Sequence, residues 1–174
     1  EHAITGLGPI FIRTAHFDYM KEVLEKVFNF KEKAVSDFDH LFEVGEGGNG
    51  AQVIIEDNPL LPQARQGYGS VHHVAFRVEN REVLEEWINH IQSYGLNTSG
   101  YVNRHFFESL YSQVAPQILF ELATDGPGFM GDEPYETLGE KLSLPPFLEP
   151  KRATIEKSVR PINTVRSTIN YTKE

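Results

Sequence analysis

Two stretches of this chain combine an apolar strand pattern with side chains that can bind a metal ion. Residues 70–78 contain the adjacent histidines His72 and His73, and residues 117–123 carry one acidic residue, Glu121, within an apolar run. Because side chains alternate between the two faces of a strand, His73 and Glu121 each lie opposite an apolar packing face. A histidine and a glutamate on neighbouring strands are two of the three ligands of a 2-His-1-carboxylate metal site.

The composition limits the classes to which the protein can belong. At 174 residues, the chain is long enough for one good-sized domain or two small repeats. Its net charge of −9, without a basic stripe, argues against nucleic acid or an anionic membrane as a partner. It contains no cysteine, which excludes thiolate ligands and is compatible with a cytoplasmic location. No apolar run approaches the roughly 20 residues of a membrane span, so we expect no membrane partner.

The predicted elements follow the order β-α-β-β-β twice. In the first half we predict a strand, a helix and three strands at residues 4–14, 17–28, 30–35, 40–44 and 51–56. In the second half we predict the same elements at residues 72–78, 81–94, 97–103, 106–114 and 116–123. Asn80 is a suitable N-cap for the second helix and Gly95 a suitable end. This order predicts an α+β protein of paired βαβββ repeats.

The repeats occupy about residues 1–66 and 67–125 of a single module spanning residues 1–125. The remaining residues, 126–174, are rich in Pro, Glu and Lys and have too few apolar positions for a core of their own. We therefore expect them to form a C-terminal tail that wraps over the module.

The two repeats can be aligned with each other. Residues 7–13 match residues 71–77, and residues 52–56 match residues 117–121. In this alignment Pro9 stands at the position of His73, and Glu56 at the position of Glu121. Because a proline side chain cannot bind a metal, the alignment predicts only half of a metal site in this chain.

Paired βαβββ units with such a His and Glu resemble the vicinal oxygen chelate superfamily, which includes glyoxalase I, bleomycin-resistance proteins and extradiol dioxygenases. Four segments resemble more specifically the bacterial ring-cleaving dioxygenases of the hydroquinone type: residues 69–76, 104–111, 118–129 and 139–152. The resemblance covers nearly the whole chain but only the C-terminal half of such an enzyme. It implies an open cup-shaped sheet. Residues 112–116 depart from the pattern, because typical members have a glycine-containing turn there.

The resemblance also implies the roles of five residues. His73 and Glu121 would bind Fe(II), with Mn, Zn or Ni as alternative metals. His72 and Tyr111 would be acid-base or hydrogen-bonding groups beside the metal, and Arg104 would help to orient the substrate. That substrate would be a small hydroquinone- or catechol-like aromatic, cleaved with O2. We expect an N-terminal module or a second subunit to supply the remaining histidine ligand.

Other interpretations of these residues remain open. Glu56 could complete a His-Glu-Glu site in a glyoxalase-type lyase or isomerase. The cup could also bind an aromatic ligand without catalysis. Without a metal, His73 would be a hydrogen-bonded core histidine. Glu121 would then be a buried carboxylate held by Arg77 or Arg104, because an unpaired buried charge is costly.

Overall fold

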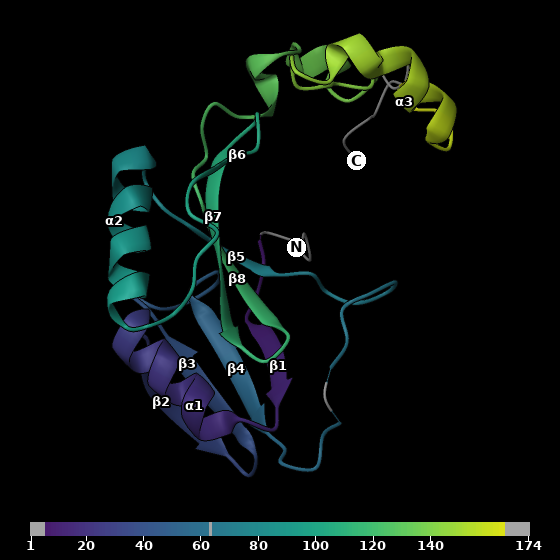
Figure 1. Ribbon diagram of the computed structural model, residues 1–174. Coiled ribbons are helices and arrows are strands. Elements are labelled where there is room, and N and C mark those ends of the chain that lie inside the picture. The colour runs from purple at the N-terminus through teal and green to yellow at the C-terminus, as the bar shows by residue number, and fades with distance from the viewer. Residues whose placement is uncertain (1–5, 63, 166–174) are drawn as a thin grey trace, which may run out of the picture.

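The computed structural model describes residues 6–62 and 64–165 and contains two βαβββ units (Figure 1). The first unit consists of β1 (Ile10–Thr14), α1 (Phe17–Glu22), a π-helical turn (Val23–Val27), β2 (Lys31–Ser36), β3 (Asp39–Glu43) and β4 (Gln52–Asp57). The second consists of β5 (Val74–Arg77), α2 (Arg81–Ser93), β6 (Val102–Asn103), β7 (Glu108–Ala115) and β8 (Ile118–Ala123). The prediction of an α+β protein with paired βαβββ repeats is confirmed.

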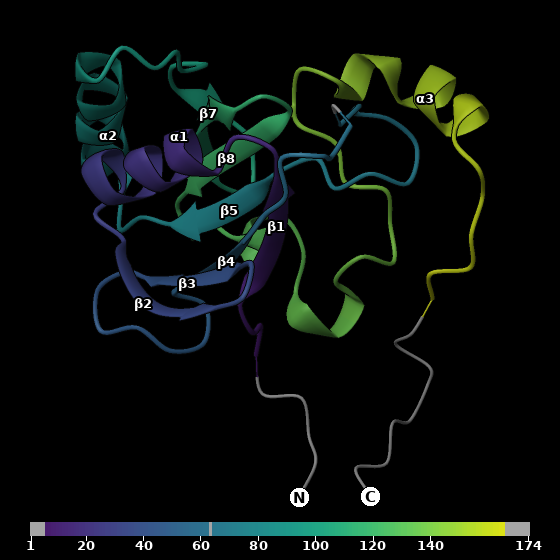
Figure 2. The same ribbon diagram turned by 90° about the horizontal axis from the view of Figure 1, so that it is seen from below.

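Each unit forms its own four-stranded mixed sheet. The strand orders are β1-β4-β3-β2 and β5-β8-β7-β6, and in both sheets the first strand is parallel to the last strand of its unit. The helices α1 and α2 lie on one side of the sheets (Figures 1 and 2). We call the opposite side of each sheet its open face.

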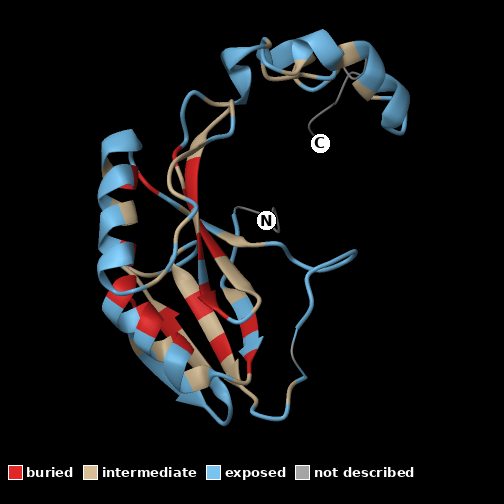
Figure 3. Cartoon of the chain, in the orientation of Figure 1, coloured by how far each residue is buried: buried red, intermediate tan, exposed pale blue. Residues whose placement is uncertain are grey.

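The hydrophobic core lies between the helices and the sheets (Figure 3). Phe120 is 1% exposed, and its ring packs edge-on against Phe28 at 5.4 Å and Phe76 at 5.1 Å between centroids. Phe120 and Leu122 are both buried in this core. Side chains alternate along a strand, so Glu121 between them is directed to the open face.

Local sequence explains the ends of α2 and the turn of the hairpin formed by β3 and β4. The Asn80 side chain accepts a hydrogen bond from the backbone N–H of Val83 at 3.0 Å, which confirms the predicted N-cap. After the helix, Gly95 adopts a φ of +78°, a conformation that glycine adopts without a steric penalty. Four glycines with positive φ lie in the turn between β3 and β4, within the glycine-rich residues 45–50.

The turn between β7 and β8 forms without glycine. Gln117 takes the left-handed conformation there, with a φ of +62°. The pairing shifts by one residue between Gln113 and Ala115, which places a bulge just before the turn. The strands still pair from Ala115 to Ser109, so the departure from the family pattern at residues 112–116 leaves the sheet intact.

Beyond β8, residues 125–165 form an arm that extends from the second sheet (Figures 1 and 2). It contains three 3-10 turns, at Phe129–Gly131, Tyr135–Thr137 and Glu149–Lys151, and the helix α3 at Arg152–Ser158. None of the arm's residues is buried (Figure 3). The predicted tail boundary and its wrapping over the module remain predictions, and residues 166–174 lie outside the described residues.

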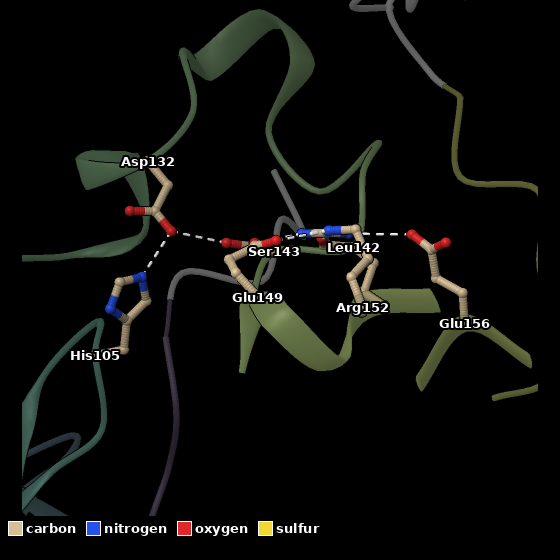
Figure 4. A network of polar contacts seen from close by, with 7 residues as sticks. All are labelled: His105, Asp132, Leu142, Ser143, Glu149, Arg152 and Glu156. Atoms are coloured by element: carbon tan, nitrogen blue, oxygen red, sulfur yellow. Dashed lines mark hydrogen bonds and ion pairs between the residues drawn. The ribbon is translucent and has the colours of Figure 1, made fainter. Parts of the chain in front are cut away.

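Polar contacts tie the arm to the second unit and hold it together (Figure 4). The ring nitrogen Nε2 of His105, just before β7, lies 2.8 Å from Oδ2 of Asp132 in the arm. The hydroxyl of Ser143 donates to the same carboxylate oxygen at 2.7 Å, and these two contacts lower the pKa of Asp132, with Ser143 the larger cause. Further along, Arg152 bonds to Glu149 and Glu156. These contacts give the arm a defined shape although it has no core.

Candidate metal centre

The centre of the site is a contact between His73 and Glu121. The ring nitrogen Nε2 of His73, just before β5, lies 2.7 Å from Oε2 of Glu121 on β8. The Glu121 side chain is 3% exposed and the His73 side chain is 31% exposed. The parallel pairing of β5 with β8 places Val74 opposite Phe120 and Ala75 opposite Glu121. This register brings the side chains of His73 and Glu121 together on the open face.

Tyr111 on β7 and Arg104 in the loop between β6 and β7 extend this cluster. Tyr111 lies directly opposite Glu121 in the antiparallel pairing, and its hydroxyl donates a short hydrogen bond to Oε1 of Glu121. Arg104 Nε donates to the same hydroxyl oxygen at 3.0 Å, and its guanidinium carbon lies 4.9 Å from the centre of the Tyr111 ring. Within residues 6–62 and 64–165, each oxygen of the buried carboxylate therefore has one partner, and Arg104 is linked to the carboxylate through the Tyr111 hydroxyl.

The second histidine supports the first. Nδ1 of His72 lies 2.7 Å from Nδ1 of His73. At 2.7 Å, the contact between Nε2 of His73 and Glu121 requires a proton on Nε2, because the carboxylate can only accept. A metal ion between the two groups would take the place of that proton, and Nδ1 of His73 would then carry the ring proton and donate it to His72. A hydrogen bond to the other ring nitrogen is the usual way in which proteins fix a metal-binding tautomer.

Gln66 holds the segment that carries both histidines, a role that the sequence did not reveal. Its side-chain nitrogen Nε2 lies 3.3 Å from the carbonyl oxygens of Val71 and His72, and 3.4 Å from that of Gln117. The donor therefore joins the residues before β5 to the turn before β8. No local pattern in the connector at residues 57–69 distinguishes Gln66 from its polar neighbours.

The residues present fit part of a metal site. Among the described residues, His73 is the one ion-pair partner of the buried Glu121 carboxylate, so a bound cation would offset a charge that otherwise depends on an imidazole and a phenol. Imidazole nitrogen and carboxylate oxygen are two of the three donors of a facial triad. Within residues 6–62 and 64–165, however, no group of three or more His, Cys, Asp or Glu side chains could hold a metal ion.

The arginines that could have held Glu121 are engaged elsewhere. Arg77 Nε lies 2.9 Å from Oδ1 of Asp125, and Arg104 contacts Tyr111. The expectation that one of them pairs directly with Glu121 is therefore wrong. The reason is geometric, because Arg77 pairs with Ala123, two residues beyond Glu121 on β8.

The alignment of Glu56 with Glu121 is also wrong. In the first sheet, β1 pairs with β4 so that Phe11 lies opposite Ile54 and Arg13 opposite Glu56. With Pro9 kept equivalent to His73, Phe11 corresponds to Ala75, and the counterpart of Glu121 is therefore Ile54.

Glu56 has partners of its own. It forms a two-point ion pair with Arg13, at 2.9 and 3.0 Å, and accepts from Asn58 at 3.0 Å. These contacts lower the pKa of Glu56, with Arg13 the main cause. The geometry therefore gives no support to Glu56 as an added ligand beside His73.

Two cavities adjoin the cluster. A cavity of about 210 Å³ lies between β1 and β5 and is lined mainly by apolar side chains, including Phe11, together with His72 and His73. A larger one of about 730 Å³ is lined by His16 and Tyr19, the loop after α2, and Tyr111, Gln113 and Leu119. Each of them is large enough for a single aromatic ring.

No helix among the described residues is both long and apolar enough to cross a membrane.

Comparison with known proteins identifies relatives over most of the chain. The family model of the Glyoxalase/Bleomycin resistance protein/Dioxygenase superfamily matches residues 6–130. The "Putative ring-cleaving dioxygenase MhqA" of Bacillus subtilis is 41% identical over 167 residues, which are 93% of this chain and 53% of that protein. The chlorohydroquinone/hydroquinone 1,2-dioxygenase of Sphingobium indicum is 29% identical over 75% of this chain and 41% of its own length.

Solved structures agree with this result. The crystal structure of a "putative dioxygenase" from Bacillus subtilis superimposes with a TM-score of 0.83 and 32% identity, over 94% of this chain and 52% of that one. The fosfomycin resistance protein FosX of Listeria monocytogenes, solved with Mn(II) and sulfate, shares the fold at 21% identity and a TM-score of 0.57, over 72% of this chain and 94% of its own. The chain spans about half the length of the curated relatives that it matches.

Proposed function

We propose that this chain, which belongs to the Glyoxalase/Bleomycin resistance protein/Dioxygenase superfamily, is the metal-binding half of a ring-cleaving dioxygenase acting on hydroquinone- or catechol-like aromatics. The observation that carries the proposal is the 2.7 Å contact between His73 Nε2 and the buried Glu121 carboxylate. The named activities of the relatives support it, as does the match to the hydroquinone dioxygenase of Sphingobium indicum.

His73 and Glu121 would hold Fe(II), and the same donors also suit Mn, Zn or Ni. When bound, the metal supplies the redox chemistry that ring cleavage by O2 requires. A third protein ligand is needed for tight binding, and we expect it from a histidine of another module or of a second subunit. Two protein donors alone leave most coordination positions to water, which weakens metal binding.

The other residues of the cluster support binding and proton transfer. With the metal bound, His72 would accept a hydrogen bond from Nδ1–H of His73 and so fix the tautomer in which Nε2 is free to bind the metal. Tyr111 fixes one oxygen of Glu121 and leaves the other for the metal. Its hydroxyl also stands beside the site, where it can exchange a proton with a phenolic substrate. Arg104 holds that hydroxyl in place with its Nε donor.

An oxygen-uptake assay tests the proposal. The chain is mixed with the N-terminal module of a relative, Fe(II) and methylhydroquinone. We expect O2 consumption that requires all components and that falls to background in His73→Ala. O2 uptake unchanged by His73→Ala would refute the assignment. If the wild-type mixture consumes no O2 and aromatic binding survives the His73→Ala, Glu121→Ala double substitution, the chain would instead be a non-catalytic binding module.

A further inference from the structure

We propose that Gln113 determines substrate specificity by binding, through its side-chain amide, the polar ring substituent that lies away from the metal. This inference rests on the proposed function, because it takes His73 and Glu121 as the metal-binding end of the site. It selects aromatic rings with two polar groups on opposite sides, such as 1,4-dihydroxybenzenes, over simple phenols.

Strand register places Gln113 on the open face beside the metal cluster. In the pairing of β7 with β8, Tyr111 lies opposite Glu121 and Gln113 lies opposite Leu119. Residues two apart on a strand share a face, so Gln113 and Leu119 lie on the same side of the sheet as Tyr111 and Glu121. Ser112 is buried at 2% exposed, which agrees with the opposite orientation of the residue between Tyr111 and Gln113.

Leu119 lies between the metal ligand and Gln113. Because Val74 pairs with Phe120, the preceding residue His73 is next to Leu119 on the other side of β8. Strand spacing of about 4.8 Å then puts the backbones of His73 and Gln113 roughly 10 Å apart, with Leu119 in the middle. An aromatic ring resting on the apolar Leu119 side chain spans this interval, with one substituent towards His73 and the other towards Gln113.

The amide of Gln113 is available for such a contact. Gln113 is exposed, and among the described residues its side chain has no hydrogen-bond partner. It lines both the cavity of about 730 Å³ that reaches Tyr111 and a smaller one of about 130 Å³ that reaches His72. Leu119 also lines both cavities, so Gln113 and Leu119 border the space beside Tyr111 as well as the space beside His72.

Two neighbouring hydroxyl groups are already engaged. The Tyr111 hydroxyl bonds to Glu121 and Arg104. The Ser99 hydroxyl accepts from the Tyr111 backbone N–H and donates to the Gly100 carbonyl. A primary amide both donates and accepts, as a ring hydroxyl does, so Gln113 can either donate a hydrogen bond to such a group or accept one from it.

Binding measurements test the inference without relying on turnover. The full chain with saturating Mn(II) is titrated calorimetrically with hydroquinone and with 4-methylphenol, which replaces one ring hydroxyl by methyl. We expect the wild-type protein to prefer hydroquinone, and Gln113→Leu to weaken hydroquinone binding roughly three- to tenfold, the range of one net hydrogen bond. The same substitution should change the affinity for 4-methylphenol less than about twofold, because this ligand has no second hydroxyl to bind the amide.

A matched control and a separate metal variant distinguish the outcomes. Gln92→Leu makes the same substitution at an exposed position of α2, on the helix side of the molecule, and should leave both affinities unchanged. Equal effects of Gln113→Leu on both ligands, no effect on either, or no preference for hydroquinone in the wild type would overturn the role of Gln113. Metal binding that is unchanged in His73→Ala would overturn the proposed function, while the ligand ratio still reports on Gln113.

Discussion

The two βαβββ units have the same order of strands but different chemistry on their open faces. In the first unit, Arg13 and Glu56 lie opposite each other and neutralise each other in a two-point ion pair. In the second, Glu121 is buried beside His73, with a tyrosine rather than an arginine on its other oxygen. Both oxygens of a carboxylate that pairs with a guanidinium are occupied, and its charge is balanced. A carboxylate paired with an imidazole and a phenol can still bind a cation.

A shift of two residues in the position of the glutamate separates these outcomes. Glu56 lies at the end of β4 where Arg13 can reach it, while Glu121 lies two positions earlier in its strand, opposite Ala75. Ala75, opposite Glu121, has a small side chain, and His73 reaches the carboxylate from the position two residues before Ala75. The same fold therefore carries a closed ion pair in one unit and a candidate metal site in the other.

The largest expected difference between the units is in core packing. Phe120→Ala should lower the free energy of unfolding by about 3–5 kcal/mol, because it opens a cavity beside Phe28 and Phe76. Its register counterpart in the first unit is Val53, and Val53→Ala should cost only about 2 kcal/mol. Urea denaturation measures both, and an equal or larger loss for Val53→Ala would contradict this ranking.

The next effect concerns the two glutamates. Glu121→Gln should weaken Fe(II) or Mn(II) binding more than about 100-fold, beyond the 10- to 100-fold loss typical of residues that only support a ligand. Glu56→Gln makes the same change in the first unit and should leave metal affinity unaltered. Calorimetric titration with Mn(II) provides the measurement. Comparable losses in both variants would mean that Glu56 is a ligand after all.

Tyr111 should have a smaller effect on the metal than its carboxylate partner. Tyr111→Phe removes the hydroxyl that orients Glu121 and should weaken Mn(II) binding about tenfold. Tyr101 is a close control, since its hydroxyl donates to Glu108 at 2.7 Å and Arg81 stacks on its ring at 4.3 Å.

Tyr101→Phe therefore removes a hydroxyl from a group of tyrosine, glutamate and arginine that resembles the one at Tyr111 but has no histidine. This substitution should not change metal affinity. Electron paramagnetic resonance of Mn(II) separates free from bound ion in both variants. An unchanged affinity in Tyr111→Phe would show that Glu121 does not need this contact for its orientation.

The smallest expected effect is an acid sensitivity of the first unit. Glu32 contacts Lys21 and His40 at 2.6 Å each, and these contacts, Lys21 first, lower the pKa of Glu32. Its ionised form therefore stabilises the fold above the ordinary glutamate pKa of about 4.3, and this contribution is lost as the pH falls through the lowered pKa.

Glu32→Gln should accordingly cost about 0.5–1 kcal/mol at pH 7, because the group is partly exposed, and the difference from wild type should shrink below about pH 4. Urea denaturation at pH 7 and pH 3 measures this difference. Glu46→Gln, in the exposed glycine-rich turn, is the control and should show no such pH dependence. A difference that grows on acidification would contradict the assigned sign.

The sequence alone predicted the order of the elements and the candidate ligands, while the strand predicted at residues 97–103 is observed only at Val102–Asn103. Apolar periodicity and the Asn80 and Gly95 signals predicted α2 as residues 81–94, one residue longer than the helix observed. Strand alternation predicted that His73 and Glu121 are directed away from the core. Their apolar neighbours on the strands pack in or against the core, namely Val74, Phe76, Phe120 and Leu122. These features are local, and a strand or helix pattern expresses them directly.

Only the tertiary structure decided which side chains meet. Sequence alignment paired Glu56 with Glu121, while the strand register makes Ile54 the counterpart. A slip of one residue would have exposed the core face and been detectable, but a slip of two keeps every side chain on its face. The alternation of the sequence is unchanged by such a slip. Turns and cross-strand packing therefore fixed the register. The register in turn made Arg13 the partner of Glu56 and His73 the partner of Glu121.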